Sequence, residues 1–538
     1  MHRCLRGASG RVVHRFTLTT PLYYVNDKPH IGSVYTTLAA DAMARWRRLQ
    51  GDQVCLITGC DEHGLKIQRS AAAAGVPTKD YVDRMAGHFA ALWQRMGISH
   101  DRFVRTSTPQ HHRLVHEFYE RVRNNGHIRL GQQRGWYCVA CEEFKDGDGE
   151  DGETPHCAIH ARPLEWRDEE NLFFCLSHFQ EPIAQLVARE SFVGPASRRR
   201  EVQRFVEAGL RDFSISRVDL PWGIPVPHQP GHTFYVWFDA LLGYITALPD
   251  PAGPPPDLAT ALSSGWPAQL HLIGKDILRF HAVYWPAMLL AAGLPLPERV
   301  FGHGFLTREG RKMGKTLGNT LDPEALFAKV GVEPVRWYLL RDIQFGDDGD
   351  IQQKRFLDLV NNDLANTIGN LVNRTVSMSR RWFAGCVPPQ EGQQDDGCPH
   401  PLTTVAVTTT TRVSQCFDQQ DLQGAAMATL ALAETINGYL SEQAPWSAIK
   451  ESSRRDAVAA VLYGVLEATR LVGLCLQPLV PELSNRLLIQ LGCDPLDSRH
   501  GLPPGTWEQL VRWGGLPHGQ TLPEASPLLA RLELDGDL

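Results

Sequence analysis

Two short loops of this sequence carry residues suited to binding phosphate. The first, Pro29-His30-Ile31-Gly32-Ser33, lies where a strand-like stretch is followed by a helix-like one. A helix N-terminus offers unpaired backbone N–H groups and the positive end of the helix dipole. Glycine permits close approach of the backbone, and His30 can donate a hydrogen bond to a phosphate oxygen. An ordinary turn has the same composition, so this loop alone is weak evidence.

The second loop is Arg311-Lys312-Met313-Gly314-Lys315-Thr316. Two lysines on a short loop can neutralise a polyphosphate that gains charge as it leaves. The last three residues also imitate the end of a P-loop. The spacing of a P-loop is not met, because Gly310 is one residue too close and Glu309 occupies the position that needs glycine. A P-loop NTPase is therefore the less favoured interpretation.

A third group of residues has the spacing of a metal site. Cys138-x2-Cys141 is followed by Cys157-x2-His160. Three thiolates and one imidazole form a closed tetrahedral set for Zn²⁺, which is typical of a structural role. His156 is an alternative fourth ligand with poorer geometry beside Cys157, and four unconnected residues remain the other interpretation. Most of the 12 cysteines stand alone in apolar stretches and are expected to be reduced core residues.

A fourth group combines aromatic, apolar and a few polar residues. It consists of 235–240 (Tyr-Val-Trp-Phe-Asp-Ala) and 274–277 (Gly-Lys-Asp-Ile), with His281 one helical turn further on. Such a mixture describes a small-molecule pocket. It describes a hydrophobic core equally well.

The elements that must position these groups alternate between strand and helix. Residues 16–20 form a predicted strand, 21–29 a loop, and a helix follows to residue 50. Residues 54–57 are a short apolar run, as in a buried parallel strand, and Asp61-Glu62-His63-Gly64 follows it. This order predicts an open α/β sheet, in which ligands bind at the carboxyl ends of the strands.

The rest of the chain divides in the same way. Residues 123–225 are rich in Gly, Asp, Glu and Cys and indicate an inserted domain. Strands are predicted at 270–273 and 300–305, with a helix over 277–290 between them. From about residue 323 to 490 the pattern is helical, with a linker at 384–401. The tail ends in Leu528–Leu534, which could pack back on the body.

Length and charge set wider limits. A chain of 538 residues is expected to form two to four domains. The net charge of -6 argues weakly against a nucleic-acid binder, and the basic runs at 45–48, 198–200 and 380–381 are interpreted as solvated faces. No membrane-spanning run of about 18 apolar residues is found. Residues 1–15 are basic without an apolar stretch, so a disordered tail is favoured over an organellar presequence.

Taken together and in this order, the pieces strongly resemble the methionyl-tRNA synthetase family from about Phe16 to about Leu534. Class I synthetases carry a His-Ile-Gly-His motif and, after the second half of a split nucleotide-binding fold, Lys-Met-Ser-Lys-Ser. His30–Ser33 and Lys312–Thr316 resemble these motifs and lie about 280 residues apart. Ser33 replaces the second His and Gly314 replaces Ser. We expect the second His to be dispensable, because a hydroxyl can still donate to phosphate.

The resemblance implies three sets of site residues. ATP is expected at Pro29, His30, Gly32, Ser33, Lys312, Met313, Gly314, Lys315 and Thr316, with His30, Lys312 and Lys315 catalytic. Methionine is expected at Leu22, Tyr24, Asp61, Trp237, Ala240, Tyr244, Ile277 and His281. In the family, the carboxylate at the Asp61 position holds the substrate amino group and the aromatic and apolar side chains enclose the thioether, which favours aromatic contact. His281 or Tyr24 could offer a weak hydrogen bond near the sulfur.

The third set is the anticodon-reading positions, which the resemblance puts at Asn370, Arg374 and Trp446. An aromatic plane for an unstacked base and polar groups for base edges suit a single-stranded RNA loop. Without the resemblance, Trp446 beside Pro445 would be interpreted as a core residue.

The resemblance implies an α/β protein with a split Rossmann-like catalytic domain and a zinc-knuckle insert, followed by an all-α helical-bundle anticodon-binding domain. The expected segments are an extension (1–15), the first catalytic half (16–122), the insert (123–225), the second half (226–306), a Lys-rich loop and stem-contact region (307–360) and the helical domain with its tail (361–538).

The implied activity is ATP-dependent formation of methionyl-adenylate and transfer of methionine to tRNA(Met), initiator tRNA included, with Mg²⁺ and one structural Zn²⁺. A cytoplasmic monomer without membrane contact is expected. The alternatives are a class I ligase for Cys, Leu, Ile or Val, and a zinc-bearing RNA-binding or NTPase protein. The insert is too short for the editing domain of the branched-chain enzymes, and the cysteine enzyme places zinc in its amino-acid pocket.

Overall fold

The computed structural model describes residues 5–6, 12–139, 143–145, 154–157, 162–218, 220–313, 319–389 and 400–533. Contacts between residues divide the chain into two compact units, each built from separate segments. The sheet unit comprises Thr17–Pro29 and Cys55–His303. The helical unit comprises Met1–Phe16, His30–Val54 and Gly304–Leu538.

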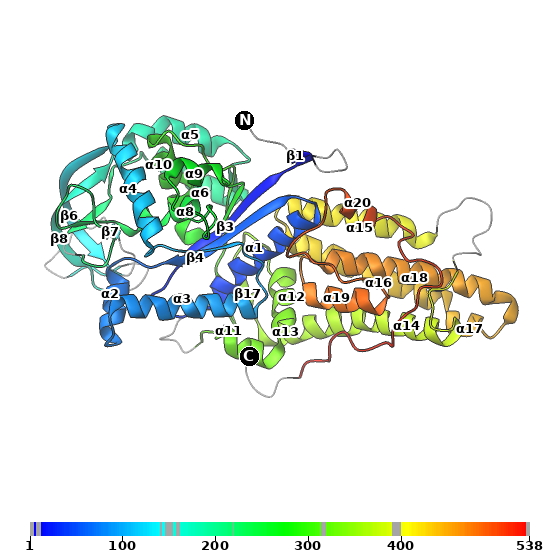
Figure 1. The fold of residues 1–538 in the computed structure, drawn as a ribbon. Coiled ribbons are helices and arrows are strands. Elements are labelled where there is room, and N and C mark those ends of the chain that lie inside the picture. The colour runs from blue at the N-terminus through cyan, green and yellow to red at the C-terminus, as the bar shows by residue number, and fades with distance from the viewer. Residues whose placement is uncertain are drawn as a thin grey trace. The chain divides into compact units, whose positions relative to one another are not determined.

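A six-stranded sheet with the order β5-β4-β3-β13-β14-β9 forms the centre of the sheet unit (Figure 1). The pairs β4–β5, β3–β13, β13–β14 and β14–β9 are parallel. The strands are β3 (Arg15–Tyr24), β4 (Gln53–Asp61), β5 (Arg102–Arg105), β9 (Val193–Gly194), β13 (Leu270–Gly274) and β14 (Val300–His303). The open α/β sheet expected from the alternation of strands and helices is therefore confirmed.

Two parts of this sheet differ from the expectation. β3 continues through Pro21 to Tyr24 instead of ending at Thr20, because the fixed φ of proline is compatible with extended backbone. β9 comes from the segment expected to be a separate insert, and its Val193 pairs with Val300 of β14. The insert thus contributes a strand to the main sheet.

Helices and shorter strands complete the sheet unit. The helices are α2 (Leu65–Ala73), α3 (Thr78–Arg95), α4 (Pro109–Asn124), α5 (Gln180–Ala188), α6 (Ala196–Glu207), α7 (Val236–Ala240), α8 (Gly243–Thr246), α9 (Leu258–Ser263) and α10 (Trp285–Ala291). An antiparallel sheet has the order β10 (Phe213–Ser214), β8 (Glu165–Phe174), β6 (Ile128–Cys138) and β7 (Glu143–Lys145). β11 (Ser216–Val218) pairs with β12 (His232–Phe234).

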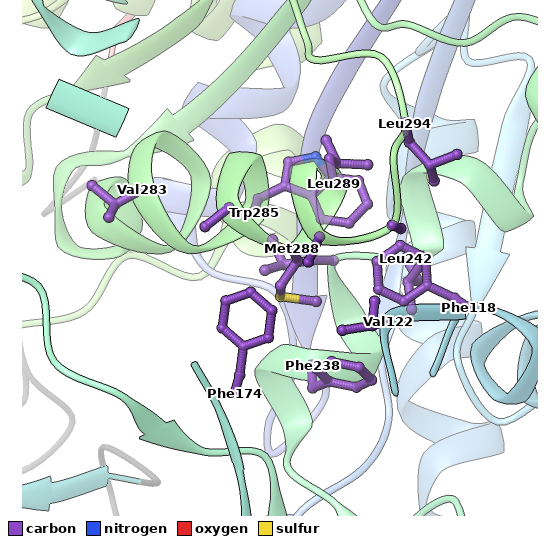
Figure 2. Close-up of a cluster of buried hydrophobic side chains, with 14 of the residues drawn as sticks. Phe118, Val122, Phe174, Phe238, Leu242, Val283, Trp285, Met288, Leu289 and Leu294 are labelled. Carbon is purple, nitrogen blue, oxygen red and sulfur yellow. The ribbon is translucent and has the colours of Figure 1, made fainter. Parts of the chain in front are cut away.

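The hydrophobic core of the sheet unit is rich in aromatic rings. Figure 2 shows Met288 of α10 among the rings of Phe118, Phe174 and Phe238, which come from α4, β8 and α7. All four side chains are buried. Because these elements are far apart in the sequence, their shared core fixes α7 and α10 in place within the unit.

The helical unit begins with α1 (Ile31–Leu49), which packs against the C-terminal helices. Trp46 stacks on Phe417 at a centroid distance of 4.8 Å and meets Trp507 edge-on at 5.2 Å. Arg45 is buried and its Nε lies 2.8 Å from Asp41. The interpretation of residues 45–48 as a solvated basic face is therefore wrong, because the helix buries the charge beside a carboxylate.

The remaining elements of the helical unit are mostly helices (Figure 1). They are α11 (Pro323–Val330), α12 (Val332–Asp342), α13 (Gln353–Leu359), α14 (Asn370–Trp382), α15 (Pro401–Asp418), α16 (Leu422–Gln443), α17 (Pro445–Ala448), α18 (Arg455–Leu476), α19 (Pro481–Gln490) and α20 (Thr506–Leu510). A small sheet joins β15 (Leu306–Arg308), β16 (Arg311–Lys312) and β17 (Gly349–Ile351), and β1 (Leu5–Arg6) pairs with β2 (Val12–Val13).

Two features of this unit bear on the expectations. The described part of the tail does pack back, since Leu528 is buried and the backbone N–H of Leu532 donates to Asn361 Oδ1 at 2.7 Å. Within the described residues, the helix Ser452–Leu476 is long and apolar enough to cross a membrane, but 89% of its apolar window is buried inside the protein. That burial is what the central helix of a bundle shows.

Candidate active site

The expected methionine residues meet in the sheet unit where β3 and β4 end. The backbone N–H of Val25 donates to the carbonyl oxygen of Asp61 at 3.2 Å, which sets Tyr24 next to the end of β4. Asp61 is 6% exposed. Both strands end on the same side because neighbouring parallel strands share their direction, and ligands of open α/β sheets bind at that end.

Tyr244 of α8 and His281 form the other side of this group. The Tyr244 hydroxyl lies 2.7 Å from Nε2 of His281, and Nδ1 of His281 lies 3.0 Å from the carbonyl oxygen of Ile277. The carbonyl can only accept, so Nδ1 carries the proton and Nε2 accepts from the tyrosine. Burial lowers the pKa of His281 to about 4, which keeps the ring neutral.

An irregular stretch of helix brings His281 to this position. The sequence predicts a helix over 277–290, whereas the chain forms a 3₁₀ turn at Lys275–Ile277 and a π turn at Phe280–Tyr284 before α10. Single π turns inside helices occur often at functional sites. The turn allows Phe280 to stack on Trp237 with centroids 4.0 Å apart, while His281 meets the same indole edge-on at 6.2 Å.

The apolar residues of the group pack closely. A Cβ at Gly243 would lie 2.3 Å from Leu22 Cδ1, so a larger residue at this position would have to displace the Leu22 side chain near the end of β3. Ala240 is buried one helical turn before Tyr244. Burial raises the pKa of the Tyr244 hydroxyl, and the negative charge of Asp61 makes a smaller contribution in the same direction. The expected pocket residues thus gather in one region of the sheet unit.

The first phosphate-binding candidate, His30, is the N-cap of α1 in the helical unit. Its Nδ1 accepts a hydrogen bond from the backbone N–H of Gly32 at 3.1 Å. The proton of the neutral ring is therefore on Nε2, which can donate to an anion. A Cβ at Gly32 would lie 2.9 Å from the His30 ring, so glycine is required for this cap. Ser33 is buried in the first turn.

The second candidate loop lies on a hairpin of the same unit. Thr307 of β15 pairs with Lys312 of β16, and Asp350 of β17 accepts hydrogen bonds from the Thr307 hydroxyl at 2.6 Å and the Gly310 N–H at 2.8 Å. The Lys312 side chain is exposed, and Asn319 donates to its carbonyl oxygen at 3.1 Å. Gly314, Lys315 and Thr316 lie outside the described residues.

The anticodon candidates lie together on the helical bundle. The Arg374 guanidinium of α14 lies over the Trp446 ring at 5.3 Å. Trp446 is 39% exposed, so it is not the core residue that its neighbour Pro445 suggested. Asn370 begins α14 one helical turn before Arg374 and is also exposed. An exposed aromatic ring beside polar groups can stack an unpaired base.

Comparison with known families covers nearly the whole chain. The model described as tRNA synthetases class I (M) matches residues 16–161 and 148–376. The model for the anticodon binding domain of methionyl tRNA ligase matches residues 391–523. The chain belongs to the methionyl-tRNA synthetase family.

Individual relatives agree with this assignment. The chain is 50% identical over 521 residues to the methionine–tRNA ligase of Thermosynechococcus vestitus, covering 96% of this chain and 98% of the relative. It is 46% identical to the chloroplastic/mitochondrial methionine–tRNA ligase of Arabidopsis thaliana, covering 97% of this chain and 83% of the relative. A solved Mycobacterium tuberculosis methionyl-tRNA synthetase in complex with methionyl-adenylate superposes with a TM-score of 0.88 at 38% identity, covering 96% and 100% of the two chains.

Membership of the methionyl-tRNA synthetase family confirms the expected Rossmann-like catalytic domain, the helical anticodon-binding domain that follows it, and the class I ligase activity. The chain activates methionine with ATP to methionyl-adenylate and transfers it to tRNA(Met). The alternatives, a ligase for another amino acid and an NTPase without ligase activity, are thereby excluded.

The zinc candidates are only partly described. Cys138 at the end of β6 and Cys157 are both buried and share a small cluster with Leu164. Cys141 and His160 lie outside the described residues. Within the part of the chain that is described, no three His, Cys, Asp or Glu side chains could hold a metal ion. Two buried thiols in one cluster fit the expected zinc knuckle, but half of the proposed ligand set is not described.

Polar residues behind Asp61 were missed by the sequence reasoning. The Glu62 carboxylate is buried and accepts from Arg105 Nε at 2.5 Å and from the Ser107 hydroxyl. Nδ1 of His63 lies 3.1 Å from Asp239 Oδ2. The three consecutive polar residues 61–63 after a buried apolar run could have indicated such partners. Charged side chains that are buried at the end of a strand need partners of opposite charge or hydrogen bonds.

Proposed function

We propose that this synthetase binds methionine in the sheet unit between the carboxyl ends of β3 and β4 and the residues of α7, α8 and the π turn. Asp61 holds the substrate ammonium group. Leu22, Tyr24, Trp237, Ala240, Tyr244, Ile277 and His281 enclose the side chain. The observation that carries this proposal is the hydrogen bond between Tyr244 and His281, which fixes two pocket rings near the Asp61 carboxylate.

This arrangement suits a thioether. Sulfur is polarizable and makes favourable contacts with aromatic rings, and Trp237 and Tyr244 supply such rings. Both ring nitrogens of His281 already have partners, namely the Tyr244 hydroxyl and the Ile277 carbonyl. Tyr24 is therefore the better candidate for a weak hydrogen bond to the sulfur.

ATP is proposed to bind at Pro29, His30, Gly32 and Ser33 and at residues 312–316. The N–H of His30 Nε2 and the amino end of α1 hold the phosphate region, because both present donors to an anion. Lys312 and Lys315 neutralise the departing pyrophosphate, and the Mg²⁺ that accompanies ATP shares its charge. No side chain is needed as a covalent nucleophile, since positioning and charge stabilisation suffice.

The two chemical steps then follow. A methionine carboxylate oxygen forms a bond to the α-phosphorus of ATP, and the bond from that phosphorus to the bridging oxygen of the β-phosphate breaks, so pyrophosphate leaves. In the second step a ribose hydroxyl of the 3′-terminal adenosine of tRNA attacks the methionyl carbonyl and AMP leaves. In the first step His30 and the two lysines act on phosphate oxygens and form no bond to carbon.

Asn370, Arg374 and Trp446 are proposed to read the anticodon, with an anticodon base stacked on Trp446. Initiator and elongator tRNA(Met) both carry the methionine anticodon, so both are expected substrates. Cys138, Cys141, Cys157 and His160 are proposed to hold one Zn²⁺, which would stabilise the insert rather than take part in catalysis. A cytoplasmic monomer with segment boundaries at 15, 122, 225, 306 and 360 completes the proposal.

The test of the pocket is pyrophosphate exchange with a panel of amino acids in the wild-type chain and in Asp61→Ala. Methionine alone should support exchange, and Asp61→Ala should raise the methionine KM by about tenfold or more, the loss expected for a charged hydrogen bond. An unchanged methionine KM in Asp61→Ala would contradict the proposed role of the carboxylate.

A further inference from the structure

The end of β4 is held on two sides by buried polar pairs. Asp61 ends the strand, and the next two residues, Glu62 and His63, are both buried. Glu62 pairs with Arg105, the last residue of β5, and His63 pairs with Asp239 of α7. The first pair connects neighbouring strands. The second connects the strand to the helix on the opposite side of the proposed methionine pocket.

Asp239 lies between Trp237 and Ala240 on α7, so a bond to it acts on the part of the helix that carries two pocket residues. The other side of α7 is anchored in the core. Phe238 stacks on Phe234 with centroids 5.2 Å apart. It also meets Phe118 with centroids 6.0 Å apart, and Figure 2 shows these two rings. The position of α7 is therefore set by an apolar anchor on one side and by the His63–Asp239 hydrogen bond on the other.

Burying the His63–Asp239 pair in the protein interior costs free energy. Asp239 is fully buried, and its Oδ1 has no hydrogen-bond partner among the residues that the structure describes. Burying a carboxyl group with one oxygen unsatisfied costs free energy that an apolar side chain of similar size would not. Packing alone does not explain why a carboxyl group occupies this position. A role in fixing the position of α7 relative to β4 does explain it.

We propose that His63 and Asp239 are positioning residues that fix the separation between Asp61 and the pocket residues of α7, and thereby set the affinity for methionine. The inference rests on the proposed roles of Asp61 and Trp237 in binding methionine. Asp61 holds the ammonium group and Trp237 the side chain, so the same ligand must reach both. A shift of α7 relative to β4 would weaken one contact whenever the other is made.

The pair is expected to act on methionine rather than on ATP. His30 and Lys312, the phosphate candidates, belong to the helical unit, whereas both members of the pair and every proposed pocket residue belong to the sheet unit. Greater mobility of α7 is therefore expected to affect the methionine site and not the phosphate-binding residues His30 and Lys312. If the His63–Asp239 pair only stabilised the fold, its removal would lower the unfolding temperature and would not change the methionine KM more than the ATP KM.

The experiment is pyrophosphate exchange at varied methionine and varied ATP in three variants. Asp239→Ala should raise the methionine KM by about tenfold and leave the ATP KM within about twofold. Asp239→Asn should recover most of the loss, because its amide can still hydrogen-bond to Nδ1 of His63. His63→Leu, which removes the bond from the other side, should match Asp239→Ala, and the double variant should lose no more than either single one.

Glu467→Gln is the matched control. Glu467 is another fully buried carboxylate, but it lies in the helical unit, where it accepts from Arg470 and from the backbone N–H groups of Gly514 and Gly515. This variant should lower the unfolding temperature without changing either KM. Equal rises of both Michaelis constants in Asp239→Ala, or no rise, would overturn the proposal.

Two further outcomes also test the positioning role of His63 and Asp239. If Asp239→Ala does not fold, the methionine KM of His63→Leu and the recovery in Asp239→Asn carry the test. A normal methionine KM in Asp61→Ala would remove the proposed role of Asp61 itself. That result is distinct from a normal KM in Asp239→Ala beside a raised KM in Asp61→Ala, which would refute only the positioning role.

Discussion

Tyr244 donates its hydroxyl hydrogen to Nε2 of His281 across 2.7 Å, and both side chains are buried. The two residues come from α8 and from a π turn that are separated by a strand of the main sheet. Nδ1 of His281 donates to the Ile277 carbonyl oxygen, so Nε2 carries no proton and accepts the hydrogen bond from Tyr244. Two hydrogen bonds, one at each ring nitrogen, therefore orient the imidazole in the proposed methionine pocket, and the Tyr244 hydroxyl supplies one of them.

Replacing Tyr244 by Phe should weaken methionine binding. The substitution leaves the ring in place but leaves a buried acceptor without a donor, which costs about 1–3 kcal/mol. If the imidazole turns to find another partner, the methionine KM should rise by roughly five- to a hundredfold. Exchange kinetics at saturating ATP measure this. A normal methionine KM in a well-folded Tyr244→Phe would show that the hydroxyl has no part in shaping the pocket.

Acid should destabilise the protein through His281. Burial lowers the pKa of this residue from 6.5 to about 4, so the unfolded chain takes up a proton at a higher pH than the folded one. The stabilisation is complete above pH 6.5 and is lost as the pH falls toward 4, by about 3 kcal/mol at most. His63, with a pKa also lowered to about 4, contributes in the same direction.

The measurement is denaturant unfolding between pH 7 and 4. His281→Gln should be less stable than wild type at pH 7 yet lose less stability as the pH falls, because one of the buried imidazoles is gone. Parallel pH curves for the two proteins would show that His281 is not neutral in the folded state.

Predictions from the sequence agree best with the structure where secondary structure follows from a local pattern of apolar and polar residues. The alternation of apolar strands and helices predicted the sheet, although β4 runs from Gln53 to Asp61 and so continues four residues beyond the strand predicted at 54–57. The helical pattern from 323 onward is likewise observed.

Partners far apart in the chain could not be predicted. Glu62 and Arg105 are 43 residues apart and meet because β4 and β5 are neighbours. His63 and Asp239 are 176 residues apart. The burial of Arg45 was missed for a different reason. Its partner Asp41 is only four residues away, but the helix face that they share is covered by tertiary packing that the sequence does not show. The π turn at His281 has no sequence signal that separates it from an ordinary helix.

The two arginines of α1 should differ sharply in their contribution to stability. Arg45 is buried against Asp41 and donates to the Ser498 hydroxyl at 3.0 Å, so Arg45→Ala should cost about 3–5 kcal/mol. Arg47 is partly exposed and lies 3.4 Å from Asp418, so Arg47→Ala should cost less than about 1 kcal/mol. Denaturant unfolding of both variants measures the difference, and similar losses would contradict the assigned burial.

Lys315 should act on the rate of activation rather than on methionine binding. Its positive charge stabilises the leaving pyrophosphate, and an interaction made chiefly in the transition state lowers kcat when it is removed. Lys315→Ala should therefore reduce the rate of adenylate formation by about a hundredfold, or 2.7 kcal/mol of barrier, with a nearly unchanged methionine KM. Single-turnover adenylate formation provides the rate. An equal effect on methionine affinity would contradict this role.

Trp446 should matter for tRNA and not for adenylate formation. Its ring is exposed and carries the Arg374 guanidinium on one face at 5.3 Å, so a base stacked on the other face would lose about 1–3 kcal/mol in Trp446→Ala. The KM for tRNA in aminoacylation should rise by roughly five- to a hundredfold, while methionine-dependent pyrophosphate exchange stays at the wild-type rate. Trp446→Phe keeps an aromatic face and should recover most of the loss. If Trp446→Ala instead lowers exchange and charging together, the ring supports the fold of the bundle and does not contact the anticodon.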